Sequence, residues 1–205
     1  MIVQWCCKGV GDLPSRTIWG IFASGAGLKC RLWQLNSPLK TTEVVDRLTE
    51  LHLDLHVNQY GRMEPGGKLV RDVTPFLSLS AGCVTRSTLL RTNVLHRAQR
   101  TALGFATNWG RDPGWLFTCY VLVSVNRAVG VQAVAEETRE LNHGRRYSPY
   151  FTEGEITAKV NVPANQIIGV ERWVPTGSGS IRRIGGYLNG RFAPPAALLD
   201  ERRML

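Results

Sequence analysis

One stretch of the sequence, from Trp115 to Val125, constrains the fold more than any other. Its letters are WLFTCYVLVSV, so it is apolar almost throughout. A strand with one solvent-exposed face alternates apolar and polar residues, whereas a strand that is buried on both faces is continuously apolar. The run is also too short for a membrane helix, which takes about 20 apolar residues. We therefore predict a central strand of a sheet.

The segments around this run predict both strands and helices. Apolar or alternating residues between breakers predict strands at 2–7, 28–35, 51–57, 76–80 and 167–174, with another opening at 153–155. Apolar residues at helical spacing predict helices at 15–22, 41–51, 87–107 and 133–142. The chain is expected to be an α+β protein whose sheet carries the core.

Length and composition fit one folded domain with a trailing segment. The 205 residues are 43% hydrophobic, which is enough for a sizeable core. The sequence after residue 175 contains GSGS, GG, PP and RR. We expect residues 1–175 to form the domain and residues 176–205 to be a loosely ordered C-terminal tail.

The chain is basic, with 25 Lys and Arg against 16 Asp and Glu and a formal charge of +9. Such a surplus attracts polyanions, which include nucleic acid, acidic protein surfaces and phosphate-bearing cofactors. A solvated basic face explains the same composition, so charge alone leaves both interpretations open.

The cysteines and the N-terminus bear on the compartment. The five cysteines form no CxxC and show no metal-ligand spacing, so we expect buried thiols, a reducing compartment and no metal site. The sequence does not open with a basic segment followed by a long apolar run. We expect a protein that is cytoplasmic where it is made and does not contact a membrane, while export as an effector stays open.

Glu153 and Glu155 open a predicted strand and are separated by one glycine. Side chains two residues apart on an extended segment point to the same side. Two carboxylates so close raise the pKa of one of them, and the pair can then act as a base and a fixed anion. An exposed acidic strand edge fits the same pattern.

Ser78 and Ser80 form a second pair two residues apart, in the predicted strand FLSLS. Their hydroxyls share the face opposite Leu77 and Leu79. Serine is a poor core residue, so this face is expected to meet a ligand, water or another polar side chain. Ordinary surface serines fit as well.

In this order, the two pairs resemble motifs of the Arg-Ser-Glu class of mono-ADP-ribosyltransferases, the enterotoxin- and cholera-toxin-like group. In that family a middle strand carries aromatic-x-Ser-Thr-Ser, and a Glu-x-Glu pair opens a late strand. FLSLS is similar to the middle motif, with Leu79 in the threonine position, and Glu153-Gly-Glu155 matches the late one. The resemblance covers about residues 2–173 through order and spacing. It implies a split, mostly antiparallel β-sheet with flanking helices around an NAD cleft.

The family's first motif supplies an arginine for the phosphates and ribose of NAD, and here its position falls on Lys8. Lysine keeps the positive charge but lacks the planar fork that grips two oxygens at once. Arg31, on the next predicted strand, is the alternative, and we prefer Lys8.

The resemblance also implies a role for each motif. Glu155 is the expected catalytic carboxylate, Glu153 orients or deprotonates the nucleophile, and Ser78 holds Glu155 in place. The residues expected to bind NAD, the substrate, are Lys8, Gly9, Ser78, Ser80 and Trp109. Trp109, or Phe105 in its place, would stack on nicotinamide, although a core position also explains either ring.

The acceptor is expected to be an arginine side chain on a protein. In this family Glu-x-Glu usually accompanies transfer to arginine, whose guanidinium must lose a proton before it attacks. The loop 147–151 resembles the family's target-recognition turn. The alternatives are ADP-ribosylation of a nucleic acid and a non-enzymatic basic nucleic-acid-binding protein, for which both glutamates would be dispensable.

Overall fold

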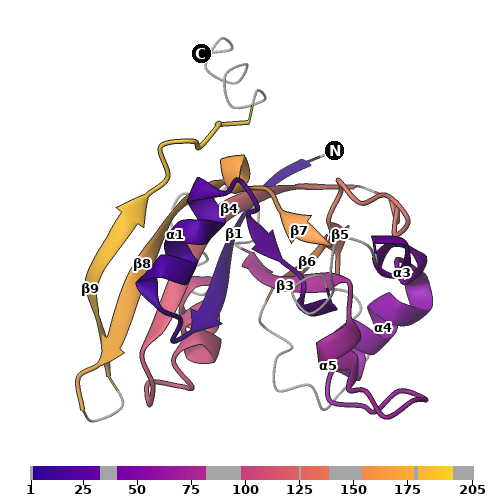
Figure 1. Ribbon diagram of the computed structural model, residues 1–205, viewed down its shortest axis with the longest axis horizontal. Helices are drawn as coiled ribbons and strands as arrows, with labels where there is room; N and C mark the ends of the chain where they lie inside the picture. The colour runs from indigo at the N-terminus through magenta and orange to yellow at the C-terminus, as the bar shows by residue number, and fades with distance from the viewer. Residues whose placement is uncertain are drawn as a thin grey trace.

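The computed structural model describes residues 2–32, 41–81, 98–124, 126–138, 154–177 and 180–195. Its core is a seven-stranded sheet in the order β5-β6-β3-β1-β4-β8-β9. Every pair of neighbouring strands in this sheet is antiparallel. Helices lie on its faces (Figure 1). The predicted α+β class with a mostly antiparallel sheet is therefore confirmed.

The elements can be followed in Figure 1. The strands of the large sheet are β1 (Ile2–Gly11), β3 (Phe76–Ala81), β4 (Gly114–Val123), β5 (Glu136–Glu137), β6 (Glu155–Lys159), β8 (Ile167–Pro175) and β9 (Ile181–Leu188). Two short strands, β2 (Leu28–Lys29) and β7 (Asn161–Val162), pair separately. The helices are α1 (Ser15–Ala23), α3 (Thr41–Asp46), α4 (Glu50–Asn58) and α5 (Val70–Val73), with a 3-10 turn at Ala164–Gln166. Residues 98–106 are also helical, and the rest of the predicted helix 87–107 lies largely outside the described residues. None of the helices in the described ranges is long and apolar enough to cross a membrane.

β4 lies between β1 and β8, inside the sheet, as its apolar sequence predicts. On one face Phe117 is buried in the main core, where Phe22 of α1 packs against it with ring centroids 6.1 Å apart. On the other face Leu116 packs against the helical residues 98–106. Because both faces are covered, the strand has no reason to alternate apolar and polar residues.

A glycine in β1 lets the helical segment 98–106 approach the sheet closely. A Cβ atom at Gly9 would lie 1.8 Å from the backbone oxygen of Ala102, a separation that no real contact reaches. Gly9 is therefore required for packing, whatever its relation to a cofactor. This gives a structural reason for a residue that the resemblance assigns to NAD binding.

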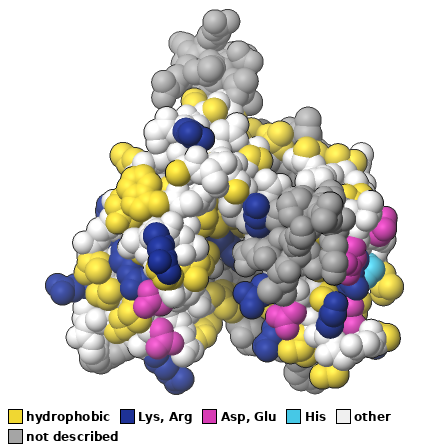
Figure 2. All heavy atoms as spheres, viewed as in Figure 1, with side chains coloured by type: hydrophobic (Ala, Val, Ile, Leu, Met, Phe, Trp, Pro, Cys, Tyr) yellow, Lys and Arg dark blue, Asp and Glu magenta, His cyan; other side chains and the backbone are white. Residues whose placement is uncertain are grey.

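The sheet divides between β1 and β3. In the described residues these strands pair at Cys6 with Ala81 and at Cys7 with Ser80. Beyond Cys7, β1 continues to pair with β4, while the rest of β3 pairs with β6. The two halves of the sheet therefore separate at this point. Figure 2 shows this face of the molecule hollowed between the half with α1 and β9 and the half with α3, α4 and α5.

The predicted strand at 51–57 is wrong, because these residues belong to α4. Thr49 caps the helix by accepting a hydrogen bond from the His52 backbone N–H, and the buried residues Leu53 and His56 are three positions apart. That spacing is helical, although alternating leucines also fit a strand. The predicted single helix at 41–51 is likewise replaced by α3 and the start of α4.

The predicted helix at 133–142 is wrong over its described part, which contains β5. The side chain of Glu136 is buried 2.8 Å from the Lys159 ammonium, which neutralises the charge of its carboxylate. This ion pair allows a charged residue to occupy a buried position on β5. Over the described residues 28–32, the predicted strand at 28–35 consists of β2 followed by helical residues at 31–32.

The C-terminal part of the sheet includes β9, which lies within the predicted loosely ordered tail. β9 pairs with β8 from the Gly169–Leu188 pair to the Pro175–Ile181 pair. Residues 181–188 therefore form an edge strand, whose pairing shifts register opposite Arg172 and Trp173. The proposed domain boundary at residue 175 stays a prediction.

Candidate active site

One ladder between β3 and β6 brings the serine pair to the late-strand glutamate. Ser80 lies directly opposite Glu155, and Ser78 lies opposite Thr157. Residues opposite each other in an antiparallel pair, and those two positions along, point to the same side with Cβ atoms about 5 Å apart across the ladder. Ser78, Ser80 and Glu155 are therefore neighbours, although the first and the last lie 77 positions apart in the sequence.

His56 of α4 lies between Ser78 and Glu155. Its Nε2 atom is 2.9 Å from Ser78 Oγ and 3.8 Å from Glu155 Oε1. Its Nδ1 atom is 2.9 Å from Thr74 Oγ1. Burial, with a smaller effect of the Lys8 ammonium, lowers the pKa of His56 to about 3. The imidazole is therefore neutral at physiological pH, and its contact with Glu155 is not an ion pair.

The surroundings of the imidazole favour the tautomer with hydrogen on Nε2. Thr74 Oγ1 accepts a hydrogen bond from the Phe76 backbone N–H at 3.3 Å, which leaves the Thr74 hydroxyl hydrogen to donate to His56 Nδ1. On the opposite side of the ring, an Nε2–H group facing the Glu155 carboxylate is attracted, whereas a lone pair there would be repelled. His56 thus donates toward Ser78 and Glu155.

Lys8 reaches the same group from β1. Its Nζ atom donates to the backbone oxygen of Ser78 at 2.9 Å, beyond the point where the β1–β3 ladder ends. Arg31, the alternative cation, instead forms an exposed ion pair with Asp72, with Nε and Oδ1 3.8 Å apart. The structure therefore places Lys8 at Ser78, and leaves the role of either cation toward NAD untested.

Glu155 is a buried carboxylate, with 6% of its surface exposed. Its backbone oxygen accepts from Thr138 Oγ1 at 2.9 Å, and its side-chain Oε1 lies 3.5 Å from Thr157 Oγ1. The preceding residue, Gly154, has φ of 62° and its backbone oxygen accepts from Ala81 N–H at 2.9 Å. A glycine adopts this left-handed conformation without steric cost, so Gly154 sets the direction in which β6 begins.

Two aromatic rings pack against the His56 imidazole. Tyr60 meets the imidazole edge to face with centroids 5.4 Å apart, and Phe76 lies 5.6 Å from it. Burial raises the pKa of Tyr60 above its usual value. The Tyr60 side chain is half exposed, so it lies at the boundary between the buried group and solvent.

Trp109, the predicted partner of nicotinamide, is not part of this group. Trp109 is 61% exposed and packs against Phe105, with ring centroids 5.8 Å apart. Its stacking on nicotinamide stays a prediction. Glu153 and the loop 147–151 lie outside the described residues.

Sequence reasoning missed His56 as a member of the site. His52 and His56 fall in the predicted strand 51–57, and neither was assigned to the site. On the actual helix His52 interacts with Thr49 at the exposed N-terminus, while His56 lies one turn further on, beside buried Leu53. The Thr49 cap was the signal in the sequence that could have placed His56 on a buried helix face.

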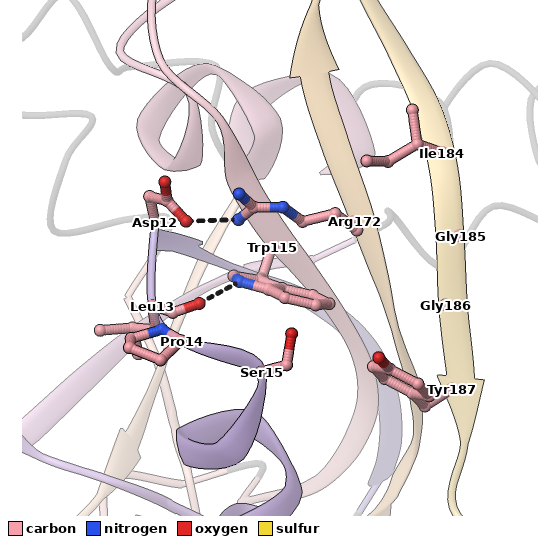
Figure 3. Close-up of a pocket in the computed structure, with 10 residues that line it drawn as sticks. All are labelled: Asp12, Leu13, Pro14, Ser15, Trp115, Arg172, Ile184, Gly185, Gly186 and Tyr187. Atoms are coloured by element: carbon pink, nitrogen blue, oxygen red, sulfur yellow. Dashed lines mark hydrogen bonds and ion pairs between the residues drawn. The ribbon is translucent and has the colours of Figure 1, made fainter.

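A cavity of about 550 Å³ lies elsewhere, between the β1–α1 connection and β9 (Figure 3). It is lined by Asp12, Leu13, Pro14, Ser15, Trp115, Arg172, Ile184, Gly185, Gly186 and Tyr187. The guanidinium of Arg172 lies 4.9 Å from the Trp115 ring centroid and 2.7 Å from Asp12 Oδ1. Trp115 Nε1 donates to Leu13 O at 2.9 Å. These contacts attach the connection to β4 and β8, and none of the residues around Glu155 takes part.

The group around Glu155 has a defined chemical capacity. A buried carboxylate beside polar donors can stabilise positive charge that develops next to it, and a nearby ammonium can hold an anion. The neutral imidazole faces the carboxylate at 3.8 Å without compensating its charge.

Comparisons with known proteins give only a distant structural likeness. No protein-family model matches the sequence, and neither does any curated protein. The solved structure of EcPltA is 12% identical, covering 94% of this chain and 89% of its own, with a TM-score of 0.46. The A subunit of a heat-labile enterotoxin mutant is 16% identical over 92% of this chain and 75% of its own, with a TM-score of 0.45. An E. coli heat-labile enterotoxin mutant is 17% identical over 91% and 76%, with a TM-score of 0.40.

Proposed function

We propose that this chain is a mono-ADP-ribosyltransferase that cleaves NAD and transfers ADP-ribose to an arginine side chain of a protein. The observation that carries the proposal is the position of Glu155. This buried carboxylate lies 3.8 Å from the neutral imidazole of His56, which contacts Ser78 at 2.9 Å beside the Lys8 ammonium. The group lies where the two halves of the sheet separate.

The proposed chemistry begins with the bond between nicotinamide and ribose. When this bond breaks, its electron pair leaves with nicotinamide, which becomes neutral, and positive charge develops on the ribose. An anion held in a fixed position beside the ribose lowers the energy of that state. Glu155 supplies the anion and accepts a hydrogen bond from a ribose hydroxyl.

His56 and Ser78 position this carboxylate. The His56 imidazole is held on its far side by Thr74, so its Nε2–H direction is fixed toward Ser78 and Glu155. Ser78 is in turn held from β1, where Lys8 donates to its backbone oxygen. In the proposal, Lys8 also brings positive charge to the pyrophosphate, and Ser80, opposite Glu155, adds a hydroxyl to the cleft.

Glu153 is the proposed base for an arginine acceptor. A guanidinium has a pKa above 12 and carries no free electron pair, so it must lose a proton before nitrogen attacks the ribose. Glu153 stands two residues before Glu155 in the sequence. Its proposed role rests on the Glu-x-Glu resemblance.

The experiment measures two products separately from radiolabelled NAD: free nicotinamide, and ADP-ribosylated agmatine as an arginine-like acceptor. The wild-type protein should form both. Glu153→Gln should keep slow NAD cleavage by water and lose transfer to agmatine, while Glu43→Gln on α3 serves as the matched control. Cleavage without any transfer to agmatine, in the wild type, would reject arginine as the acceptor and lead to the same assay with single-stranded DNA.

A further inference from the structure

The turn that follows the helical segment 98–106 has an unusual backbone. Three consecutive residues have positive φ: Asn108 at 47°, Trp109 at 57° and Gly110 at 85°. Left-handed conformations are uncommon for residues other than glycine, and for a bulky residue such as tryptophan they are outliers. Strained backbone of this kind persists only where the surroundings impose it.

Hydrogen bonds around Thr107 impose the conformation. The buried Thr107 hydroxyl donates to Leu103 O at 2.6 Å and accepts from Gly110 N–H at 3.1 Å. Trp109 N–H donates to Gly104 O at 2.8 Å, and Asn108 Nδ2 donates to Asp112 Oδ2 at 3.0 Å. The turn is thus fixed from both of its ends.

The tryptophan side chain in this strained turn is exposed. The six-membered ring of Trp109 lies over Gly104, where a Cβ atom would come within 2.7 Å of the ring. A glycine inside a helix and a left-handed tryptophan both reduce stability. Yet the indole stays 61% exposed, beside Phe105 at 48%. Most of the indole surface is therefore accessible, although one face of the ring packs over Gly104.

The charge around the rings indicates the class of ligand. Arg100 and Arg111 are exposed, and neither forms an ion pair with any residue that the structure describes. The whole chain carries a formal charge of +9. Arg100 precedes Gly104, over which the Trp109 ring lies, by one helical turn, and Arg111 follows Trp109 by two residues. Exposed rings and exposed arginines at this end of the helical segment suit a ligand with stacked rings and negative charge. Single-stranded nucleic acid has both, because each base offers a π face and each linkage a phosphate.

We propose that Trp109, Phe105, Arg100 and Arg111 form a binding site for single-stranded nucleic acid. A base stacks on the Trp109 indole, and the two arginines contact the flanking phosphates. The site is separate from the group around Glu155, so the proposal does not depend on the transferase activity.

The test is binding of a fluorescein-labelled dT 15-mer, followed by anisotropy without NAD. Stacking on one aromatic residue contributes about 1–3 kcal/mol, so Trp109→Ala should weaken binding by about 5-fold or more, and Trp109→Phe by much less. Trp19→Ala removes another half-exposed tryptophan, on α1, and should leave affinity unchanged. The double variant Arg100→Ala/Arg111→Ala should weaken binding and reduce its salt dependence.

A second ligand keeps the test valid even if Trp109→Ala does not fold. An abasic 15-mer has the same phosphates and no bases, so it should bind the wild-type protein about 5-fold or more weakly than the dT 15-mer does. Equal binding of the abasic and dT strands, tighter binding of a duplex, or no binding at all would overturn the proposal. Displacement of the dT strand by saturating NAD would also overturn it, since Trp109 would then serve nicotinamide.

Discussion

The Nε2 atom of His56 lies 3.8 Å from Oε1 of Glu155, although one residue comes from α4 and the other opens β6. The same nitrogen contacts Ser78 Oγ at 2.9 Å, so one imidazole joins the helical part of the molecule to two strands of the sheet. Because burial keeps this imidazole neutral, the negative charge of Glu155 is not cancelled by it.

The first prediction concerns stability against pH. The pKa of His56 is about 3 in the folded protein and about 6.5 in the unfolded chain, so the unfolded chain binds more protons between these values. The titration of His56 therefore leaves the free energy of unfolding almost unchanged above about pH 6.5 and lowers it as the pH falls further. Urea unfolding should show that His56 accounts for about 2 kcal/mol of the loss between pH 7 and pH 5.

His56→Asn provides the comparison for this measurement. Asparagine can bond to Thr74 or Ser78 but does not titrate, so the variant should lose about 2 kcal/mol less than the wild type over the same range. Equal pH dependence of the two proteins would show that His56 is protonated in the folded state.

Thr74 is predicted to set the tautomer of His56. In Thr74→Ser the hydroxyl is kept, and long-range ¹H–¹⁵N spectra should show hydrogen on Nε2, as in the wild type. In Thr74→Val the buried Nδ1 loses its partner, which should reduce stability by about 1–3 kcal/mol and shift the population toward the Nδ1–H form. An unchanged Nε2–H signature in Thr74→Val would mean that Glu155 and Ser78 alone determine the tautomer.

Gly9 and Gly11 form a matched pair on β1. Gly9→Ala would place its Cβ atom 1.8 Å from Ala102 O, whereas a Cβ at Gly11 meets nothing within 4 Å. Thermal unfolding should show that Gly9→Ala lowers stability by about 3 kcal/mol or more, while Gly11→Ala changes it little. Similar stability of the two variants would contradict the close packing of the helical segment on β1.

Much of the sheet could be predicted from the sequence because its strands are strongly patterned. β4 was identifiable from continuous apolar residues, and the pairing of Ser80 with Glu155 agrees with the predicted convergence of the two motifs. The segment 51–57 could not be assigned in this way, since L-H-L-D-L-H-V fits a strand by alternation and a helix by the spacing of Leu53 and His56. Because of that ambiguity, the prediction did not include His56 in the site.

Tertiary contacts explain the other difference. EETREL has the composition of a helix, but Glu136 is buried against Lys159 of β6, a residue far away in the sequence. The resulting β5–β6 pairing lies beside Glu155, with Glu137 opposite Ile156. Local propensity holds no information about such a partner.

The most direct test of the proposed function is the rate of NAD cleavage by purified Glu155→Gln, compared with wild type and Glu43→Gln. Glutamine keeps the size and hydrogen-bonding capacity of the side chain and removes its charge. The proposal predicts that Glu155→Gln lowers kcat by about a hundredfold or more with unchanged folding, while Glu43→Gln matches the wild type. Equal cleavage by Glu155→Gln and wild type, or no cleavage by the folded wild-type protein, would contradict it.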